Sequence, residues 1–193
     1  MDDGKASRQR KADASRELIA KARTGDREAF DTLATNYANM VIGLAFKLLG
    51  SREEALDCAQ DAFVRAWENI ERYDPKWSVA TWLRRIVTNL ALDRLRRRGG
   101  RADFSEALEG SLTSAEETPV ETAERNERAE AVRGLLELLP EKYRLVLVLR
   151  DMEGVDISDI ARITGTNAAT VRWRLHRARA LFRQRWLATS GQE

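Results

Sequence analysis

The 193-residue chain is poor in the side chains from which disulfides, zinc sites and many active sites are built. Cys58 is its only cysteine and His176 its only histidine, which excludes a disulfide framework and a self-contained zinc site of the usual Cys/His type. Catalysis needs acids, bases, nucleophiles or metal ligands that converge in a cleft, and the sequence has no Gly-rich phosphate loop either. We therefore expect a protein that is not an enzyme, with no catalytic residue, no bound metal and no cofactor.

Long apolar runs are also missing. None approaches the roughly 20 residues that a membrane helix requires, and the polar start of the chain, Met1 to Lys21, is unlike a secretory signal. A single cysteine suits a reducing compartment. The sequence predicts a soluble cytoplasmic protein without membrane insertion.

The chain has little net charge: 33 Lys and Arg nearly balance 31 Asp and Glu, which gives a formal net charge of +2. The two signs are nevertheless separated along the chain. Residues 76–101 carry eight basic residues against one acidic residue, whereas residues 102–139 carry ten acidic residues against three basic ones. This alternation indicates basic binding surfaces that are separated by an acidic connector.

The sequence has no long stretch in which apolar and polar residues alternate, as they do in β-strands. Apolar residues instead recur at spacings of three and four, which predicts an all-α fold. We expect helices over residues 26–49, 51–70, 81–98, 121–139 and 141–150, followed by two more near the end of the chain.

The same patterns divide the chain into two small helical domains. The predicted parts are a polar, mostly disordered tail (1–22), a first helical domain (23–99), a flexible acidic linker (100–130), a second helical domain (131–188) and a short tail (189–193).

The helix predicted over residues 51–70 has two different faces. On one face lie four alanines, small enough to let a neighbouring helix approach closely: Ala55, Ala59, Ala62 and Ala66. The opposite face forms an acidic stripe: Glu54, Asp57, Asp61, Val64 and Glu68. Taken alone, such a stripe is more often only a solvated surface.

A basic helix follows directly on an aromatic loop. The helix over 81–98 places Arg85, Asn89 and Arg96 along one stripe, where guanidinium groups suit phosphates and an amide suits a base edge. The loop before it contains Trp77. Unpaired bases stack on aromatic rings, whereas duplex DNA hides its base faces, so the combination favours unpaired DNA or RNA. The alternative is that Trp77 is a core residue, as we expect for Trp82.

Residues 156–183 have the pattern of a helix-turn-helix. A short helix marked by Ile157 and Ile160 is followed by a break at residues 165–167. The longer helix after the break has an apolar side and, opposite it, Trp173, His176 and Arg177. In such a motif the first helix braces the second, which reads DNA. The alternative is a helical hairpin whose arginines are only solvated.

Two stretches together resemble a known family. Residues 57–67 (DCAQDAFVRAW) and 81–93 (TWLRRIVTNLALD) resemble region 2 of the extracytoplasmic-function (ECF) sigma factors of bacterial RNA polymerase. Residues 139–144 (LPEKYR) through 170–179 (TVRWRLHRAR) resemble their region 4. The resemblance covers roughly Asp26 to Trp186 in the family's order, including its linker. Two motifs at the proper separation are more specific than a lone helix-turn-helix.

The resemblance implies three binding surfaces. The second predicted helix would dock on the clamp helices of the polymerase core, with a flap contact elsewhere, through Asp57, Gln60, Asp61, Phe63, Val64 and Glu68. The loop and the helix after it would melt and capture the −10 element, with a base flipped toward the loop, through Tyr73, Lys76, Trp77, Arg85, Asn89 and Arg96. The recognition helix would bind the duplex −35 element through Thr170, Arg172, Trp173, Arg174, His176 and Arg177.

Members of this family are commonly held by an anti-sigma factor, so the resemblance also implies such a partner. Two residues depart from the family's pattern. Trp173 stands where a small polar residue is usual, and it could pack on thymine methyls or sugar edges, or contact a protein. Cys58 replaces a common aliphatic residue, and we interpret it as a packing residue rather than a redox sensor.

The function predicted from these observations is a sigma factor that binds core polymerase, recognises and melts the −10 element and binds the −35 element. The alternative is a classical helix-turn-helix repressor or activator that acts on duplex DNA without polymerase. Such a regulator usually binds a palindromic site as a dimer, and the sequence has no obvious dimerisation helix.

Overall fold

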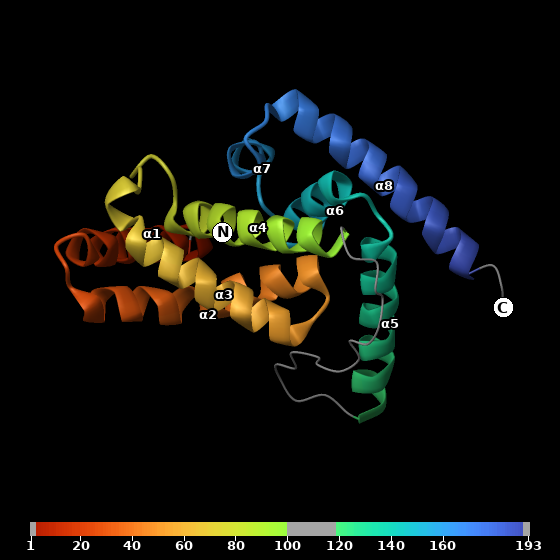
Figure 1. Ribbon diagram of the computed structural model, residues 1–193, viewed down its shortest axis with the longest axis horizontal. Helices are drawn as coiled ribbons and strands as arrows, with labels where there is room; N and C mark the ends of the chain where they lie inside the picture. Colours follow the sequence, from red (N-terminus) through yellow and green to blue (C-terminus); the bar gives the residue numbers. More distant parts are fainter. Residues whose placement is uncertain (1–2, 100–118, 191–193) are drawn as a thin grey trace.

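The structure, a computed structural model, describes residues 3–99 and 119–190, and within those ranges it is helical with no strand (Figure 1). The predicted all-α class is confirmed. The elements are α1 (Asp3–Ala22), α2 (Arg27–Leu49), α3 (Arg52–Glu68), a 3-10 turn (Ile70–Arg72), α4 (Val79–Gly99), α5 (Pro119–Glu137), α6 (Glu141–Leu147), a π turn (Val148–Met152), α7 (Ile157–Thr164) and α8 (Ala168–Ser190).

Helices α1 to α4 form the first group, which is built around α2 and α4. Leu33, Val41 and Leu44 of α2 are fully buried, as are Leu83 and Val87 of α4. The predicted alanine face of α3 is buried as well, and its small side chains let the α3 backbone approach both neighbours. The predicted helix-helix contact on this face is confirmed.

Helix boundaries in the first group follow from local capping. The side chain of Asp26 accepts a hydrogen bond from the backbone N–H of Ala29 at 3.0 Å, and Ser51 does the same for Glu54 at 3.3 Å. Gly50, with a φ of +80°, ends α2 in the left-handed conformation that glycine adopts without strain. These caps fix the sharp turn between α2 and α3.

The predicted disordered tail is wrong for residues 3–22, which form α1. Ile19 and Ala22 are 2% exposed, and the buried Ser15 hydroxyl lies 3.0 Å from the Tyr37 hydroxyl of α2. These buried positions are separated by four and three residues, too few to stand out among charged neighbours. Packing against α2 and α4 therefore orders a segment whose own sequence carries a weak helical signal.

Helices α5 to α8 form the second group. Its core contains Val146 and Leu149, with Ile160 of α7 and Val171 of α8. The helix predicted over 141–150 is α-helical only as far as Leu147 and then continues as the π turn. Helix α5 begins at Pro119, so the last twelve residues of the predicted linker are helical.

The helix-turn-helix is confirmed as α7 and α8. Gly165, with a φ of +63°, ends α7, and the side chain of Asn167 accepts a hydrogen bond from the backbone N–H of Thr170 at 2.8 Å as α8 begins. Helix α8 continues to Ser190, past residues 156–183 in which the motif was predicted, and lies along the outer edge of the molecule (Figure 1).

The rest of the predicted linker, residues 100–118, lies outside the described residues, as do the first two and the last three residues of the chain. The exact domain boundaries therefore stay a prediction. No helix in residues 3–99 and 119–190 is long and apolar enough to cross a membrane.

Candidate nucleic-acid interface

The loop between the 3-10 turn and α4 is held by hydrogen bonds within itself. The Tyr73 hydroxyl donates to the backbone carbonyl of Trp77 at 2.6 Å, and the Asp74 carboxylate accepts from the backbone N–H of Lys76 at 2.9 Å. Ser78 accepts from the backbone N–H of Thr81 at 3.0 Å as α4 begins. The loop consequently presents Trp77 from a fixed backbone.

Tyr73 has a different place from the one predicted for a DNA-binding residue. Its side chain is 5% exposed, and its ring meets that of Trp82 edge to face, with centroids 5.2 Å apart. Burial raises the pKa of the Tyr73 hydroxyl, which keeps it protonated and donating to the loop. Tyr73 supports the loop from inside and does not offer its ring to a ligand.

A cavity of about 390 Å³ opens beside this loop. It brings together three of the predicted −10 residues, Trp77, Arg85 and Asn89, and the Arg85 guanidinium lies 5.0 Å from the centre of the Trp77 ring. The remaining lining residues are Arg72, Asp74, Trp82 and Ile86. The cavity thus has aromatic walls, cationic groups and both donors and acceptors of hydrogen bonds.

Sequence reasoning missed Arg72 and Asp74 and assigned Trp82 to the core. Arg72 and Asp74 flank the buried Tyr73, and the turn of the backbone there brings both side chains to the cavity. Helical periodicity does not predict this placement, because the residues lie in a turn and a loop. Trp82 is half-buried and contributes both to the core and to the cavity wall. The other two predicted −10 residues, Lys76 and Arg96, are exposed but do not line the cavity.

Helix α3 exposes most of its predicted binding stripe. Asp57, Gln60 and Glu68 are exposed, and Val64 is 51% exposed although it is aliphatic. Asp61 is also exposed, but its carboxylate pairs with Arg94 of α4 at 2.5 Å. Phe63 is half-buried against the core. The surface is therefore a mixture of free carboxylates and one apolar side chain.

Helix α8 presents the predicted recognition face to the surface. Arg172, Trp173, His176 and Arg177 are exposed, with Trp173 at 59%. The Trp173 ring leans toward that of Tyr143 in α6, with centroids 6.1 Å apart. Thr170 and Arg174 are half-buried at the edges of this face.

Helix α8 is tied to the π turn by a paired salt bridge. The Arg179 guanidinium donates to both carboxylate oxygens of Asp151, at 2.9 and 2.6 Å. The hydrogen bond to Asp151 raises the pKa of Arg179. This bidentate contact fixes the orientation of the exposed face relative to the rest of the second group.

Cys58 is fully buried on α3, and its thiol lies 3.9 Å from the backbone carbonyl of Val87. Burial raises the pKa of the thiol to about 11. A protonated, inaccessible thiol agrees with our interpretation of Cys58 as a packing residue. Among the described residues, no group of His, Cys, Asp and Glu side chains is arranged to hold a metal ion.

Comparison with known proteins identifies the family. Residues 33–101 match the family model of Sigma-70 region 2, and residues 129–182 match that of Sigma-70 region 4. The ECF RNA polymerase sigma factor SigW of Bacillus subtilis is 31% identical over 86% of this chain and 93% of its own length. The chain belongs to the ECF sigma factors. SigM of Mycobacterium tuberculosis, another ECF sigma factor, is 38% identical over 92% of this chain and 86% of its own.

The solved structure of CnrH in complex with the cytosolic domain of CnrY has the same two-part architecture, with a TM-score of 0.70 and 27% identity over 91% of this chain and 98% of CnrH. Sigma factors are transcription regulators that direct RNA polymerase to promoters, and that general role applies to this ECF sigma factor. The resemblance read from residues 57–67 and 170–179 is thereby confirmed.

Proposed function

We propose that this ECF sigma factor binds core RNA polymerase through α3, captures the melted −10 element at the cavity beside Trp77, and binds the duplex −35 element with α8. The observation that carries the proposal is the cavity, because a fixed aromatic wall under a guanidinium is suited to an unpaired base and not to duplex DNA.

The chemistry of the cavity favours one extruded base. Its volume of about 390 Å³ lies at the lower end of the roughly 300–1,000 Å³ typical of small-ligand pockets. Trp77 offers a stacking face, while the Asn89 amide and the Asp74 carboxylate can hydrogen-bond the Watson–Crick edge of a flipped base. Arg72 and Arg85 attract the adjoining phosphates. An unpaired strand would therefore be held by stacking and charge together.

The exposed face of α8 is suited to the major groove of duplex DNA. Arg172 and Arg177 can contact guanine or phosphate, and His176 lies one turn from Arg172 on the same face. Trp173 is large for this position and could pack on a thymine methyl or a sugar edge, or contact a protein. Thr170 and Arg174 border the face and are proposed as secondary contacts.

The exposed surface of α3 is the proposed contact for core polymerase. Asp57, Gln60 and Glu68 supply polar and acidic groups around Val64, a combination that suits a basic partner surface with an apolar centre. In the family this partner is the clamp helices, with a flap contact elsewhere. An anti-sigma factor is proposed as a further partner on family grounds, and the similar protein CnrH has been solved in complex with another protein, the cytosolic domain of CnrY.

The proposal is tested by transcription with purified core polymerase and a library of promoter fragments, with and without the protein, followed by sequencing of the transcripts. We expect discrete start sites only when the protein is added, preceded by shared sequences near −10 and −35. Absence of new starts, together with tight binding of particular duplexes by the protein alone, would replace the proposal by a classical regulator.

A further inference from the structure

The proposed function leaves the contact of Trp173 undecided. Its side chain is 59% exposed near the start of the helix that is proposed to bind duplex DNA. An exposed indole keeps a large apolar surface in water, so contact with an apolar group of a partner is favourable. The position of the ring, its support and the charges around it together identify that group.

Trp173 stands at the centre of the side of α8 that faces away from the core. Val171 and Leu175 are buried and each is two residues away, which is about 200° around a helix of about 3.6 residues per turn. The exposed Ala169 lies one turn before Trp173, and the exposed Ala180 lies two turns after it along nearly the same line. Because both alanines are small, a surface that approaches this side of α8 meets the indole.

Tyr143 of α6 supports the indole from one side. The two ring centroids are 6.1 Å apart, with an angle of 53° between the ring planes, and the Tyr143 side chain is buried. Contact with a buried ring restricts the rotamers of Trp173, so the indole loses less conformational freedom when it binds. Tyr143 is therefore a positioning residue for Trp173.

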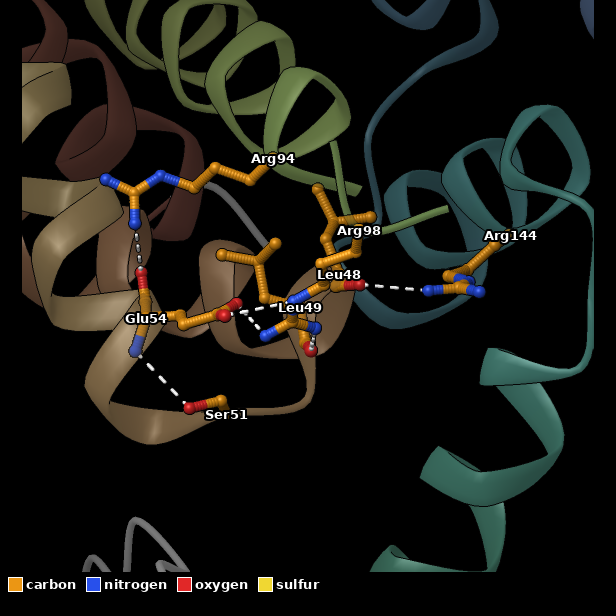
Figure 2. A network of polar contacts seen from close by, with 7 residues as sticks. All are labelled: Leu48, Leu49, Ser51, Glu54, Arg94, Arg98 and Arg144. Atoms are coloured by element: carbon orange, nitrogen blue, oxygen red, sulfur yellow. Dashed lines mark hydrogen bonds and ion pairs between the residues drawn. The ribbon is translucent and has the colours of Figure 1, made fainter. Parts of the chain in front are cut away.

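Tyr143 has a fixed place because the next residue, Arg144, anchors the first turn of α6. The Arg144 side chain is 8% exposed, and its guanidinium donates to the backbone carbonyls of Glu137 and Leu139 at 2.6 and 3.4 Å. It also donates to the carbonyl of Leu48 at the end of α2, at 3.2 Å (Figure 2). These bonds hold the backbone beside Tyr143, and with it the ring against which the indole rests.

The charges around Trp173 favour DNA over a protein as its partner. Helix α8 has no acidic residue over its whole length, and the exposed Arg172 and Arg177 lie on either side of Trp173 around the helix. The exposed Lys142 adds a cation, with its ammonium 5.1 Å from the centre of the Tyr143 ring. Phosphates complement cations that surround an apolar group, whereas the apolar centres of protein interfaces are depleted of charge.

The floor of the major groove offers one kind of apolar group, the C5-methyl of thymine. The side of a recognition helix opposite its core meets this floor, while the flanking residues reach the phosphates. Base faces are stacked inside a duplex and are closed to the indole. The indole has one N–H donor and is otherwise apolar, so most of its surface packs favourably only on the methyl group.

We propose that Trp173, positioned by Tyr143, is a specificity-determining residue that selects a thymine in the −35 element through its C5-methyl group. The proposal rests on the proposed function, because it requires α8 to lie in the major groove. Burial of one methyl-sized group raises affinity about fourfold. This gain disappears when either the methyl group or the indole is removed.

The proposal is tested by replacing thymine with uracil, which removes the C5-methyl and keeps every hydrogen-bonding group of the base pair. Promoter fragments recovered with core polymerase carry uracil at each thymine of the −35 element in turn, and competition measures their affinity for the full-length protein bound to core. For wild type, uracil at one position is expected to weaken binding about fourfold. Trp173→Ala is expected to bind the thymine and uracil fragments equally.

Trp186→Ala is the matched control, because Trp186 lies on the same helix, beyond the predicted face, and stacks on Phe182. It should keep the fourfold ratio, whatever its effect on affinity overall. Tyr143→Phe retains the supporting ring and should keep the ratio, whereas Tyr143→Leu should reduce it. Circular dichroism shows whether each variant keeps its helices, and Trp173→Gln replaces Trp173→Ala if the alanine variant does not.

A second comparison adds the methyl group to a different base. Cytosine and 5-methylcytosine are placed in turn at the position that the uracil substitutions identify, each paired with guanine. The methyl group should raise the affinity of wild type about fourfold and leave that of Trp173→Ala unchanged.

The proposal is overturned if the ratio of thymine to uracil affinity is the same for wild type and Trp173→Ala at every position. A recovered −35 element without any A·T pair overturns it as well. If the wild-type protein with core binds no promoter fragment selectively, the proposed function itself has failed and this proposal fails with it. Selective binding with an unchanged ratio instead removes only the role of Trp173.

Discussion

At the scale of single residues, burial distinguishes Trp77, which we propose as a binding residue, from Cys58, which we interpret as a packing residue. Trp77 is half-buried on a loop held by the Tyr73 hydroxyl, with one side facing a cavity. Cys58 is fully buried between α3 and α4. Trp77 can therefore contact a ligand without a change in the loop, whereas Cys58 contacts only its neighbours in the core.

Trp77→Ala is expected to weaken binding of an unpaired −10 oligonucleotide by about 1–3 kcal/mol, because it removes one stacking face. Fluorescence anisotropy with the purified protein measures the change. Trp186→Ala, at the far end of α8, is the control and should leave this affinity unchanged. Equal affinities for wild type and Trp77→Ala would remove Trp77 from the proposed site.

The Cys58 thiol is expected to make stability depend on pH in alkaline solution. Its pKa is about 11 in the folded protein against an ordinary value of 9.0, so the folded state binds the proton more tightly than the unfolded state. The stabilising contribution is complete below about pH 9 and is lost as the pH rises through about 11.

Urea unfolding of wild type and Cys58→Ala between about pH 9 and pH 11 separates the contribution of the Cys58 thiol from that of the tyrosines, which both proteins share. The free energy of unfolding should fall more steeply for wild type than for Cys58→Ala. Parallel curves would contradict a raised pKa for this thiol.

At the scale of elements, α8 is a long helix that serves two purposes along its length. Its buried side, with Val171, Leu175 and Ala178, completes the second core, while the residues between them face outward. The exposed bidentate contact from Arg179 to Asp151 adds a polar link to the π turn. The position of each exposed side chain relative to DNA is therefore set by packing on the other side.

Arg177→Ala is expected to weaken binding of α8 to a duplex carrying the −35 element by about 1–3 kcal/mol if the guanidinium contacts a base. The preference for one base at the contacted position of the element should then also be relaxed. Electrophoretic mobility shifts on duplexes selected from the promoter library measure it. Arg183→Ala is the control, since Arg183 is exposed on the same helix beyond the predicted face. Equal losses for the two variants would indicate nonspecific charge attraction instead.

At the scale of the whole molecule, the two groups are linked through a shared apolar core and through Arg144. The Arg133 guanidinium adds a contact 4.8 Å from the centre of the Phe46 ring, and the Glu137 carboxylate occupies the place that a Cβ at Gly50 would take. Side chains of α5 thus lie against α2 and the α2–α3 turn. Stability of one group is consequently coupled to that of the other.

This coupling predicts one cooperative unfolding transition for the wild-type chain in differential scanning calorimetry at low salt. Arg144→Gln should divide it into two transitions, because each group then unfolds with less support from the other. Asp159→Asn, which removes an exposed pair with Arg162 inside one group, should leave the single transition in place. Two transitions in the wild-type protein would show that the groups are energetically independent.

Much of the fold was predictable because its elements are long and periodic. Several of its features depend only on residues that are close together in the chain. These are the alanine face of α3, the caps at Asp26 and Ser51, and the helix end at Gly165. Helix α1 was not predicted, because its few apolar positions become buried only when they pack against α2 and α4. In the candidate site, Trp77, Arg85 and Asn89 were predicted together, whereas Arg72 and Asp74 depended on the path of the backbone around Tyr73.

The helical class, the order of the two regions and the family could be predicted from the residues alone, because periodicity and local motifs involve residues that are close together in the chain. Packing between helices was needed to make Tyr73 internal, to bring Trp82 into a cavity wall and to place Arg144 at the end of a helix almost 100 residues away. These features depend on contacts between residues distant along the chain. A linear pattern carries no record of such contacts, since the free energy that fixes them arises only when separate helices pack.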